Sequence, residues 1–297
     1  MKERLGYVGA LALLGIGWGA TQPLGKIAVS SGHGHFGLIF WQLIIGVLVL
    51  GAILILRRKT VPLNHRTLRF AVIVALIGTI IPNSTFYIAV ARLPAGVMAI
   101  LISMIPLISF PIALALGMDR FSGRRLMGIV CGMIGVGLIA LPKTSLEPGM
   151  AAWLPVAIIG PLFYAVEGNY VARWGTAGLD AVQAMFLASL VGAVIALPLM
   201  LVSGQWISPF PPYGWPELAL ILSSSMHALL YTGYVWLAAR AGAVFASQTG
   251  YIVTGSGMFW AMLILGERFS DWVWAAFLVM ALGLFLVAPR LRKAPGA

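Results

Sequence analysis

Several residues that can bind solutes or carry protons lie inside long apolar stretches of this sequence. In the stretch 215–239, Ser224, His227, Tyr231 and Tyr234 follow one another at intervals of three, four and three residues. In a helix these intervals place all four side chains on one face. A hydroxyl, an imidazole and two phenols can hydrogen-bond a polar solute, and the imidazole can also titrate near neutral pH. This face therefore predicts a binding surface.

Other apolar stretches carry polar and aromatic side chains about one helical turn apart. A charge at the centre of a bilayer costs about 2.5–3.5 kcal/mol on insertion scales, so polar groups there need a reason. We predict that these faces point inward and share one substrate site with the first. The predicted substrate-binding residues are Trp18, Gln22, Asn83, Tyr87, Phe163, Ser224, His227, Tyr231, Tyr234, Gln248 and Tyr251.

Two groups well inside the apolar stretches, Glu167 and His227, are candidates for proton coupling. Burial or a charged neighbour can bring either one into the working pH range. Each also has a simpler interpretation. His227 would then only hydrogen-bond a neighbouring helix, and Glu167 would pair with Arg173 or reach water at the near end of its helix.

The composition places these residues in a membrane. Of the 297 residues, 61% are hydrophobic and 9% charged, and the mean hydropathy is +0.99, whereas soluble domains are about 45–50% apolar. A spanning helix needs about 20 apolar residues. The sequence predicts an all-α integral membrane fold with ten spans, at roughly 5–29, 36–56, 67–91, 95–117, 123–142, 151–172, 180–203, 215–239, 242–265 and 272–289.

Lysine and arginine predict the orientation of these spans. With an N-terminus inside the cell, alternation of sides assigns fifteen Lys and Arg residues to the cytoplasmic side and four, Lys26, Arg92, Lys143 and Arg268, to the other. Short cytoplasmic loops carry such an excess. We therefore expect a multi-pass protein of a bacterial-type inner (plasma) membrane with both termini in the cytoplasm. The net charge of +11 then reflects topology rather than nucleic-acid binding. A cleaved signal peptide at the N-terminus is the weaker alternative.

An internal repeat divides the chain. "TFYIAVARLPAG" at 85–96 is similar to "TGYVWLAARAGA" at 232–243, and "DRFS" at 119–122 is similar to "ERFS" at 267–270. The predicted halves are 1–148 and 149–297, each with five helices, joined in one structural unit. Because five is odd, the second half enters the membrane from the opposite face, as in inverted-repeat transporters with a central cavity.

The motifs "WGATQPLGK" at 18–26, "AARAGAVFASQTGYIV" at 238–253 and "GIVCGMIGVGLIALP" at 128–142 resemble the drug/metabolite transporter (DMT) superfamily, specifically its EamA-type, ten-helix members. This resemblance implies alternating-access export of small metabolites or amino acids through a central cavity. Gln42 and Asp119 depart from the usual family pattern. These departures resemble the branch of YddG-like amino-acid exporters. The amide, hydroxyl and aromatic side chains of the predicted site favour broad recognition of large neutral or aromatic amino acids.

The sequence was also compared with the motifs of enzymes, ATP-driven pumps and metal-binding proteins. The sequence has no H-E-x-x-H, D-D-x-x-D or G-x-S-x-G motif and no phosphate-binding loop, so we expect neither an enzyme nor an ATP-driven pump, and no cofactor. His33 and His35 lack further ligands nearby, so we expect no metal. A membrane-embedded enzyme or receptor of lipid-like molecules, an exporter of drugs or other metabolites, and a channel remain alternatives. The expected partners are a small-molecule substrate and the lipid bilayer.

Three further features concern helix ends and helix packing. We expect Glu267 to hold its loop in place, by capping helix ten or by pairing with Arg268, and Lys26 to reach the lipid headgroups. The G-x-x-x-G motif in "GIVCG" at 128–132 is expected to pack helix five against helix ten, with contact to another protomer as the alternative. A monomer is therefore expected, and a dimer stays open.

Overall fold

The structure is a computed structural model that describes residues 2–142, 144–241 and 249–287. The described residues form helices and loops and contain no strand. The first half contains α1 (Lys2–Ala28), α2 (His35–Leu56), α3 (His65–Ala75), the π-helical segment η1 (Leu76–Ile80), α4 (Ile81–Val90), α5 (Ala95–Ile102), α6 (Met104–Ala115) and α7 (Gly123–Ala140). The second half contains the short 3-10 segment η2 (Met150–Trp153), α8 (Leu154–Trp174), α9 (Ala181–Val202), α10 (Trp215–Ala241), α12 (Thr249–Leu265) and α13 (Asp271–Val287).

Each of the ten predicted apolar stretches is mainly helical where the structure describes it. Among the described residues, six helical stretches are long and apolar enough to cross a membrane: 35–56, 65–90, 95–115, 123–140, 150–174 and 181–202. The apolar helices α12 and α13 are shorter, at 17 residues each. The all-helical membrane architecture predicted from composition is thus confirmed at the level of these spans.

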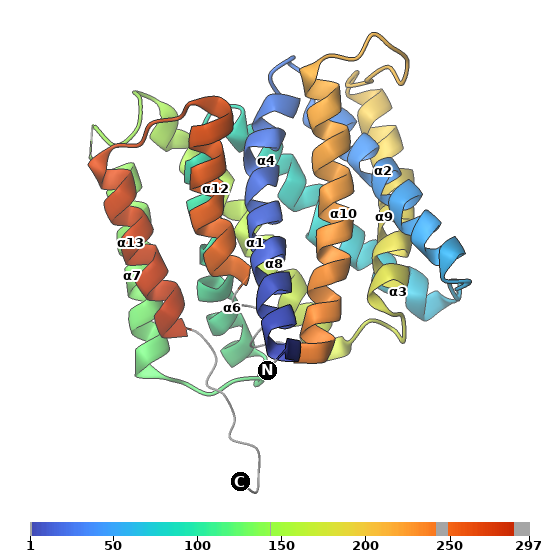
Figure 1. Cartoon of the computed structure of the whole chain (residues 1–297), viewed down its shortest axis with the longest axis horizontal. Coiled ribbons are helices and arrows are strands. Elements are labelled where there is room, and N and C mark those ends of the chain that lie inside the picture. The colour runs from blue at the N-terminus through green and yellow to red at the C-terminus, as the bar shows by residue number, and fades with distance from the viewer. Residues whose placement is uncertain (1, 143, 242–248, 288–297) are drawn as a thin grey trace, which may run out of the picture.

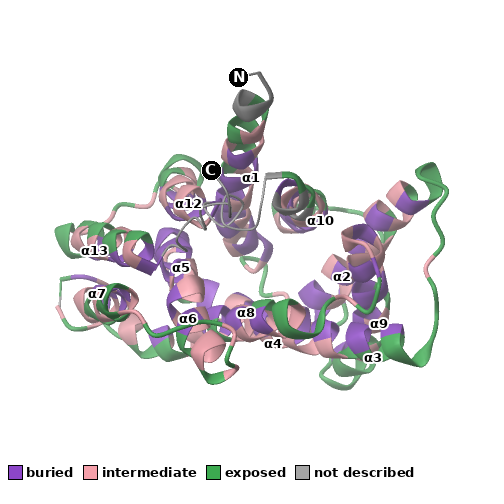
Figure 2. Ribbon diagram, turned by 90° about the horizontal axis from the view of Figure 1, so that it is seen from below, coloured by how far each residue is buried: buried purple, intermediate pink, exposed green. Residues whose placement is uncertain are grey.

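The helices stand side by side as a bundle (Figure 1). Seen from below, α7 and α13 lie at one end and α2, α3 and α9 at the other (Figure 2). Between these ends, α1 packs against α10 and α12, while α8 packs against α4 and α6. Helix α5 lies inside, where residues 95–101 are all buried.

Glycine allows two helices to approach closely at one end of the bundle. A methyl group at Gly128 of α7 would come within 2.6 Å of the Gly283 carbonyl oxygen in α13. Lipid tails are as apolar as leucine side chains, so the hydrophobic effect does not drive membrane helices together. They associate by close van der Waals packing, which small residues allow. The prediction that "GIVCG" packs helix five against helix ten is confirmed.

A proline sets the local geometry of the third span. Pro82 has no N–H, and in a regular helix its ring would collide with the carbonyl four residues earlier, that of Gly78. The chain avoids this collision by widening into η1, where the Ile81 N–H bonds to the Leu76 carbonyl five residues back. Such π-helical turns often occur at functional sites. Here the widened turn lies beside Glu167.

Glu267 holds its loop in place as predicted, but through other partners than those expected, and the prediction for Lys26 is wrong. The Glu267 carboxylate accepts hydrogen bonds from the backbone amides of Ala95 (2.7 Å) and Gly96 (3.0 Å) at the start of α5, so it caps a helix of the other half. The Lys26 ammonium lies 3.8 Å from Glu267 and donates to the Leu93 carbonyl at 2.5 Å instead of extending toward lipid. Proximity along the chain suggested the nearer partners, whereas the fold brings distant ones together.

Candidate substrate site

An aromatic cluster joins α1 and α10. The Trp18 indole N–H donates to His227 Nδ1 at 3.2 Å. The same indole makes edge contacts with the rings of Tyr231 and Tyr234, at centroid distances of 6.4 and 5.7 Å. These four side chains were all predicted for the site, and the structure brings them together.

Close packing of α1 on α10 positions this cluster. Leu14 and Leu230 are buried at the contact. Gly17 and Gly233 face them, because a methyl group at either glycine would come within 3 Å of a leucine side chain. The two helices therefore approach closely enough for an indole on one to reach an imidazole on the other.

A second group of polar side chains joins α2, α4 and α8. The Tyr87 hydroxyl donates to Gln42 Oε1 at 2.9 Å, and the Tyr164 hydroxyl donates to Asn83 Oδ1 at 2.8 Å. Asn83 and Tyr87 were predicted. Gln42 and Tyr164 were not, although Gln42 is the one amide in the apolar run of α2 and could have been found by that signal.

Glu167 lies between the two groups. Its carboxylate contacts Gly78 in the π-helical segment, and it is close enough to Tyr164 and Tyr231 to interact with them electrostatically. Within residues 2–142, 144–241 and 249–287 it makes no ion pair, so the predicted alternative of pairing with Arg173 is wrong. Glu167 is thus an interior carboxyl without a cationic partner among the described residues.

A cavity reaches part of both groups, namely His227 and Tyr231 of the first and Gln42 of the second. It lies between α2, η1, α9 and α10 and holds about 410 Å³ of empty space, part of it open to solvent. Its polar lining consists of Gln42, Thr79, Ser189, Ser224, His227 and Tyr231. Sequence reasoning missed Thr79 and Ser189, which are small hydroxyls that commonly pack between helices and give no signal of their own.

Two buried polar atoms near the cavity and the aromatic cluster have no hydrogen-bond partner among the described residues. Ser224, on the cavity wall, is 3% exposed and its Oγ is unpaired, and Gln22 of α1 is 6% exposed with an unpaired Oε1. A buried acceptor or hydroxyl left unpaired costs about 1–3 kcal/mol. Substrate or water that supplies a partner would recover this free energy.

The remaining predicted residues lie elsewhere. Tyr251, in the first turn of α12, is near Arg124 at the start of α7 and not in the aromatic cluster. Phe163 is half-buried in α8. Gln248 lies outside the described residues.

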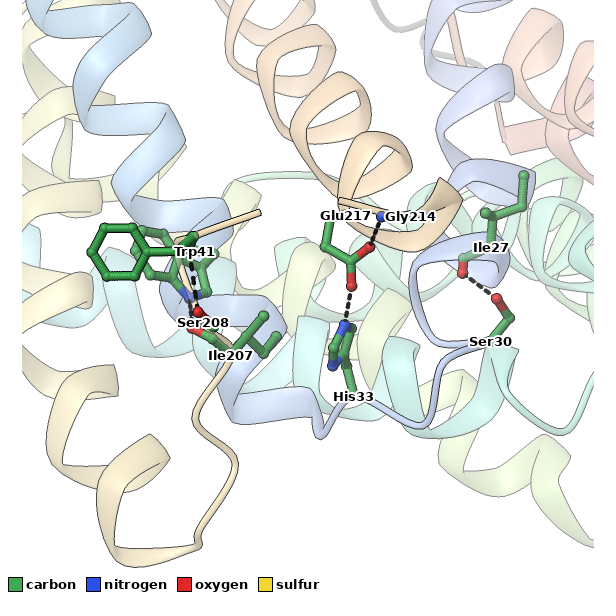
Figure 3. Close-up of polar contacts among 9 residues, drawn as sticks. Ile27, Ser30, His33, Trp41, Ile207, Ser208, Gly214 and Glu217 are labelled. Carbon is green, nitrogen blue, oxygen red and sulfur yellow. Dashed lines mark hydrogen bonds and ion pairs between the residues drawn. The ribbon is translucent and has the colours of Figure 1, made fainter. Parts of the chain in front are cut away.

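The two histidines with a metal-like spacing have other neighbours. His33 Nε2 lies 2.5 Å from Glu217 Oε1, and the Gly214 amide donates to the other carboxylate oxygen at 2.7 Å (Figure 3). The His35 ring lies 4.2 Å from that of Phe36. The His33 contact ties the α1–α2 loop to the start of α10.

Comparison with known proteins gives one family and one shared fold. The model of the EamA-like transporter family matches residues 5–141 and again residues 151–288. A solved crystal structure, titled only as that of a protein, covers 93% of this chain and 94% of its own, with a TM-score of 0.63 and 14% sequence identity. A search of curated sequences found no significant match.

Proposed function

Because the chain belongs to the EamA-like transporter family, we propose that it is a secondary transporter that exports amino acids, chiefly large neutral and aromatic ones, by alternating access. The observation that carries this proposal is the interior site in which an aromatic wall, amide and hydroxyl groups and unpaired polar atoms meet beside Glu167. Sites for small molecules combine mostly apolar walls with a few placed polar groups.

The chemistry of an amino acid matches that combination. Its ammonium can lie against the faces of Trp18, Tyr231 and Tyr234, a cation–π contact worth about 0.5–2 kcal/mol. Its side chain can pack on the same rings. Its carboxylate requires donors, and hydroxyl groups such as those of Ser224 and Thr79 supply them. Few fixed charges and a flexible aromatic wall favour broad recognition with low affinity for each substrate.

The proposed membrane arrangement is ten spans in two inverted repeats. The family model matches each half once. The first span of one half corresponds to the first span of the other, and so on in order. Under this correspondence the α1–α10 contact becomes the α8–α4 contact, and the α1–α12 contact becomes the α8–α6 contact. The α2–α9 and α7–α13 contacts are unchanged by the exchange. Contacts that exchange in this way are those expected of repeats related by a two-fold axis, which supports the inverted repeat.

The proposed location is the inner membrane, with the N-terminus in the cytoplasm. Ten Lys and Arg residues lie at or near one end of the bundle: Arg57, Arg58, Lys59, Arg66, Arg69, Arg120, Arg124, Arg125, Arg173 and Arg240. The other end has Lys26, Arg92 and Arg268 among its described residues. This bias supports a cytoplasmic position for the first end. We also propose a monomer, since the glycine face of α7 is already covered by α13.

Glu167 is the proposed proton carrier. Entry of a proton from outside would neutralise its carboxylate and weaken its attraction for the substrate ammonium, so that proton entry favours release of the substrate. Return of the proton to the cytoplasm would restore the charge for the next substrate. Export would then be driven by the proton gradient.

Export from proteoliposomes tests both parts of the proposal. Vesicles loaded with labelled phenylalanine, tryptophan or methionine should release them faster with the protein present, and a pH gradient should accelerate the release. Glu167→Gln should abolish the acceleration but retain exchange without a gradient, while His227→Gln should retain the acceleration. Absence of transport for every amino acid would reject the substrate class. A full pH response in Glu167→Gln would reject the coupling role.

A further inference from the structure

A second pocket opens at the end of the bundle that carries Lys26 and Glu267, away from the aromatic cluster. It lies between the start of α5, the α7–α8 loop and the α12–α13 loop and holds about 400 Å³ of empty space, part of it open to solvent. We propose that this pocket is a second binding site for an amino-acid zwitterion, which receives the substrate after it leaves the interior site. Its polar groups are Arg268, Glu147 and Ser145.

The charges that line this pocket are not committed to other ion pairs. Arg268 and Glu147 are exposed, and within residues 2–142, 144–241 and 249–287 neither has an oppositely charged atom within 4.0 Å. The adjacent Glu267 is occupied, because its two oxygens accept the Ala95 and Gly96 amides. A guanidinium and a carboxylate therefore line one pocket without a close ion pair, and the charge that acts on Glu147 is the Lys26 ammonium, with which it interacts only electrostatically.

Ser145 adds a buried hydroxyl that lacks a partner. Its backbone is held on both sides, because its amide donates to the Pro142 carbonyl at 3.0 Å and its carbonyl accepts from Ser270 Oγ at 3.2 Å. The residue is 7% exposed, and its Oγ makes no hydrogen bond within the part of the chain that the structure describes. A buried hydroxyl that lines a pocket without a partner is suited to a ligand oxygen or ammonium.

The ligand follows from these groups. Arginine binds a carboxylate through two parallel hydrogen bonds, Glu147 attracts an ammonium, and the apolar part of the lining, which includes Val97, Met150 and Phe269, suits a hydrocarbon side chain. A molecule with only one charge would leave the opposite charge of the pocket unsatisfied. Amino acids as the ligand class rest on the proposed function, whereas the requirement for both charges rests on the pocket alone.

Thiol protection in purified, detergent-solubilised protein tests the site. Ser145→Cys in a Cys131→Ser background would be labelled with the cation methanethiosulfonate ethyltrimethylammonium. At about four times its dissociation constant, phenylalanine should slow labelling about fivefold, because protection follows 1 + [L]/Kd. Phenethylamine and phenylpropionate, which each lack one charge, should protect far less. The matched control is Thr144→Cys, an exposed neighbour whose labelling should not change.

Further variants separate this site from the interior one. Protection should disappear with Arg268→Gln or Glu147→Gln and persist with Trp18→Ala, which damages the aromatic cluster. Loss of protection in Trp18→Ala would overturn the proposal, because the effect would then originate at the interior site. Vesicle transport without protection would reject the second site alone. Protection without vesicle transport would reject the proposed export function and leave the second site standing.

Discussion

Trp18 and His227 can form their hydrogen bond in only one direction. An indole N–H is a donor only, so His227 Nδ1 must be the acceptor, and a neutral imidazole then carries its proton on Nε2. A second proton on Nδ1 would turn it into a donor and break the bond to Trp18. His227 is therefore better suited to hold the indole in position than to carry protons, and Glu167 becomes the stronger coupling candidate of the two.

The substitution Trp18→Phe tests this positioning role. Phenylalanine keeps a ring near Tyr231 and Tyr234 but leaves His227 Nδ1 without its donor, which should cost about 1–3 kcal/mol. We expect a lower thermal unfolding temperature and weaker binding of phenylalanine, measured by light scattering on heating and by vesicle export.

The matched control is Trp260→Phe. The Trp260 indole also donates at 3.0 Å, to the Ile16 carbonyl, but this hydrogen bond is exposed, whereas that of Trp18 is partly buried. Its loss should change stability by much less. Equal effects of the two substitutions would contradict a special role for the Trp18 contact.

In the third span, the π-helical segment η1 joins α3 to α4. This segment lies beside Glu167, the proposed proton carrier. Pro82 causes the widened turn, and Gly78 at its centre leaves room for the Glu167 carboxylate. A helix with a wide turn is easier to bend than a regular one. We infer that rearrangement of this turn and protonation of Glu167 influence each other.

The substitution Gly78→Ala should change coupling without unfolding the protein. The added methyl group would meet the flexible end of Glu167, so the carboxylate moves while the backbone keeps its place. We expect normal expression and thermal stability but a reduced response of export to the pH gradient.

Gly168→Ala is the matched control, because it adds a methyl group in α8, the helix that carries Glu167, instead of in η1. Gly168 adjoins Glu167 in α8, and a methyl group there meets nothing within 4 Å. Because alanine favours helix more than glycine, this variant should be unchanged or more stable by up to about 1 kcal/mol. Unaltered pH dependence in Gly78→Ala would show that the turn has no part in coupling.

The two repeated loops lie at opposite ends of the bundle. The loop that contains Ser122 joins α6 to α7, while the loop that contains Ser270 joins α12 to α13. Their sequences differ after "RFS" in the sense expected if one faces the cytoplasm and the other does not: arginines follow in the first, Asp271 and Trp272 in the second.

Cysteine labelling in intact cells tests this topology. In a Cys131→Ser background, Ser270→Cys should react with a membrane-impermeant maleimide added outside, and Ser122→Cys should react only after the cells are opened. Labelling of both positions from the same side would reject the inverted repeat. Denatured samples, in which both thiols react, provide the control for accessibility.

Local properties of the sequence were sufficient for the helices, the family and part of the site. Apolar runs specify helical spans wherever they occur, Pro82 disturbs its helix within one turn, and helical spacing placed Tyr231 and Tyr234 on one face beside His227. The repeated "RFS" loops and the family motifs are likewise contained in short stretches of chain.

Contacts between distant segments were decided only by the tertiary structure. Glu267 caps α5, whose first residues lie more than 170 positions earlier in the chain. Tyr164 meets Asn83, and Gln42 meets Tyr87, because α8 and α2 present those faces to α4. Tyr251 lies near Arg124 instead of the aromatic cluster. The rotation of each helix about its axis depends on where small residues on two helices allow close approach, and periodicity within one helix does not contain that information.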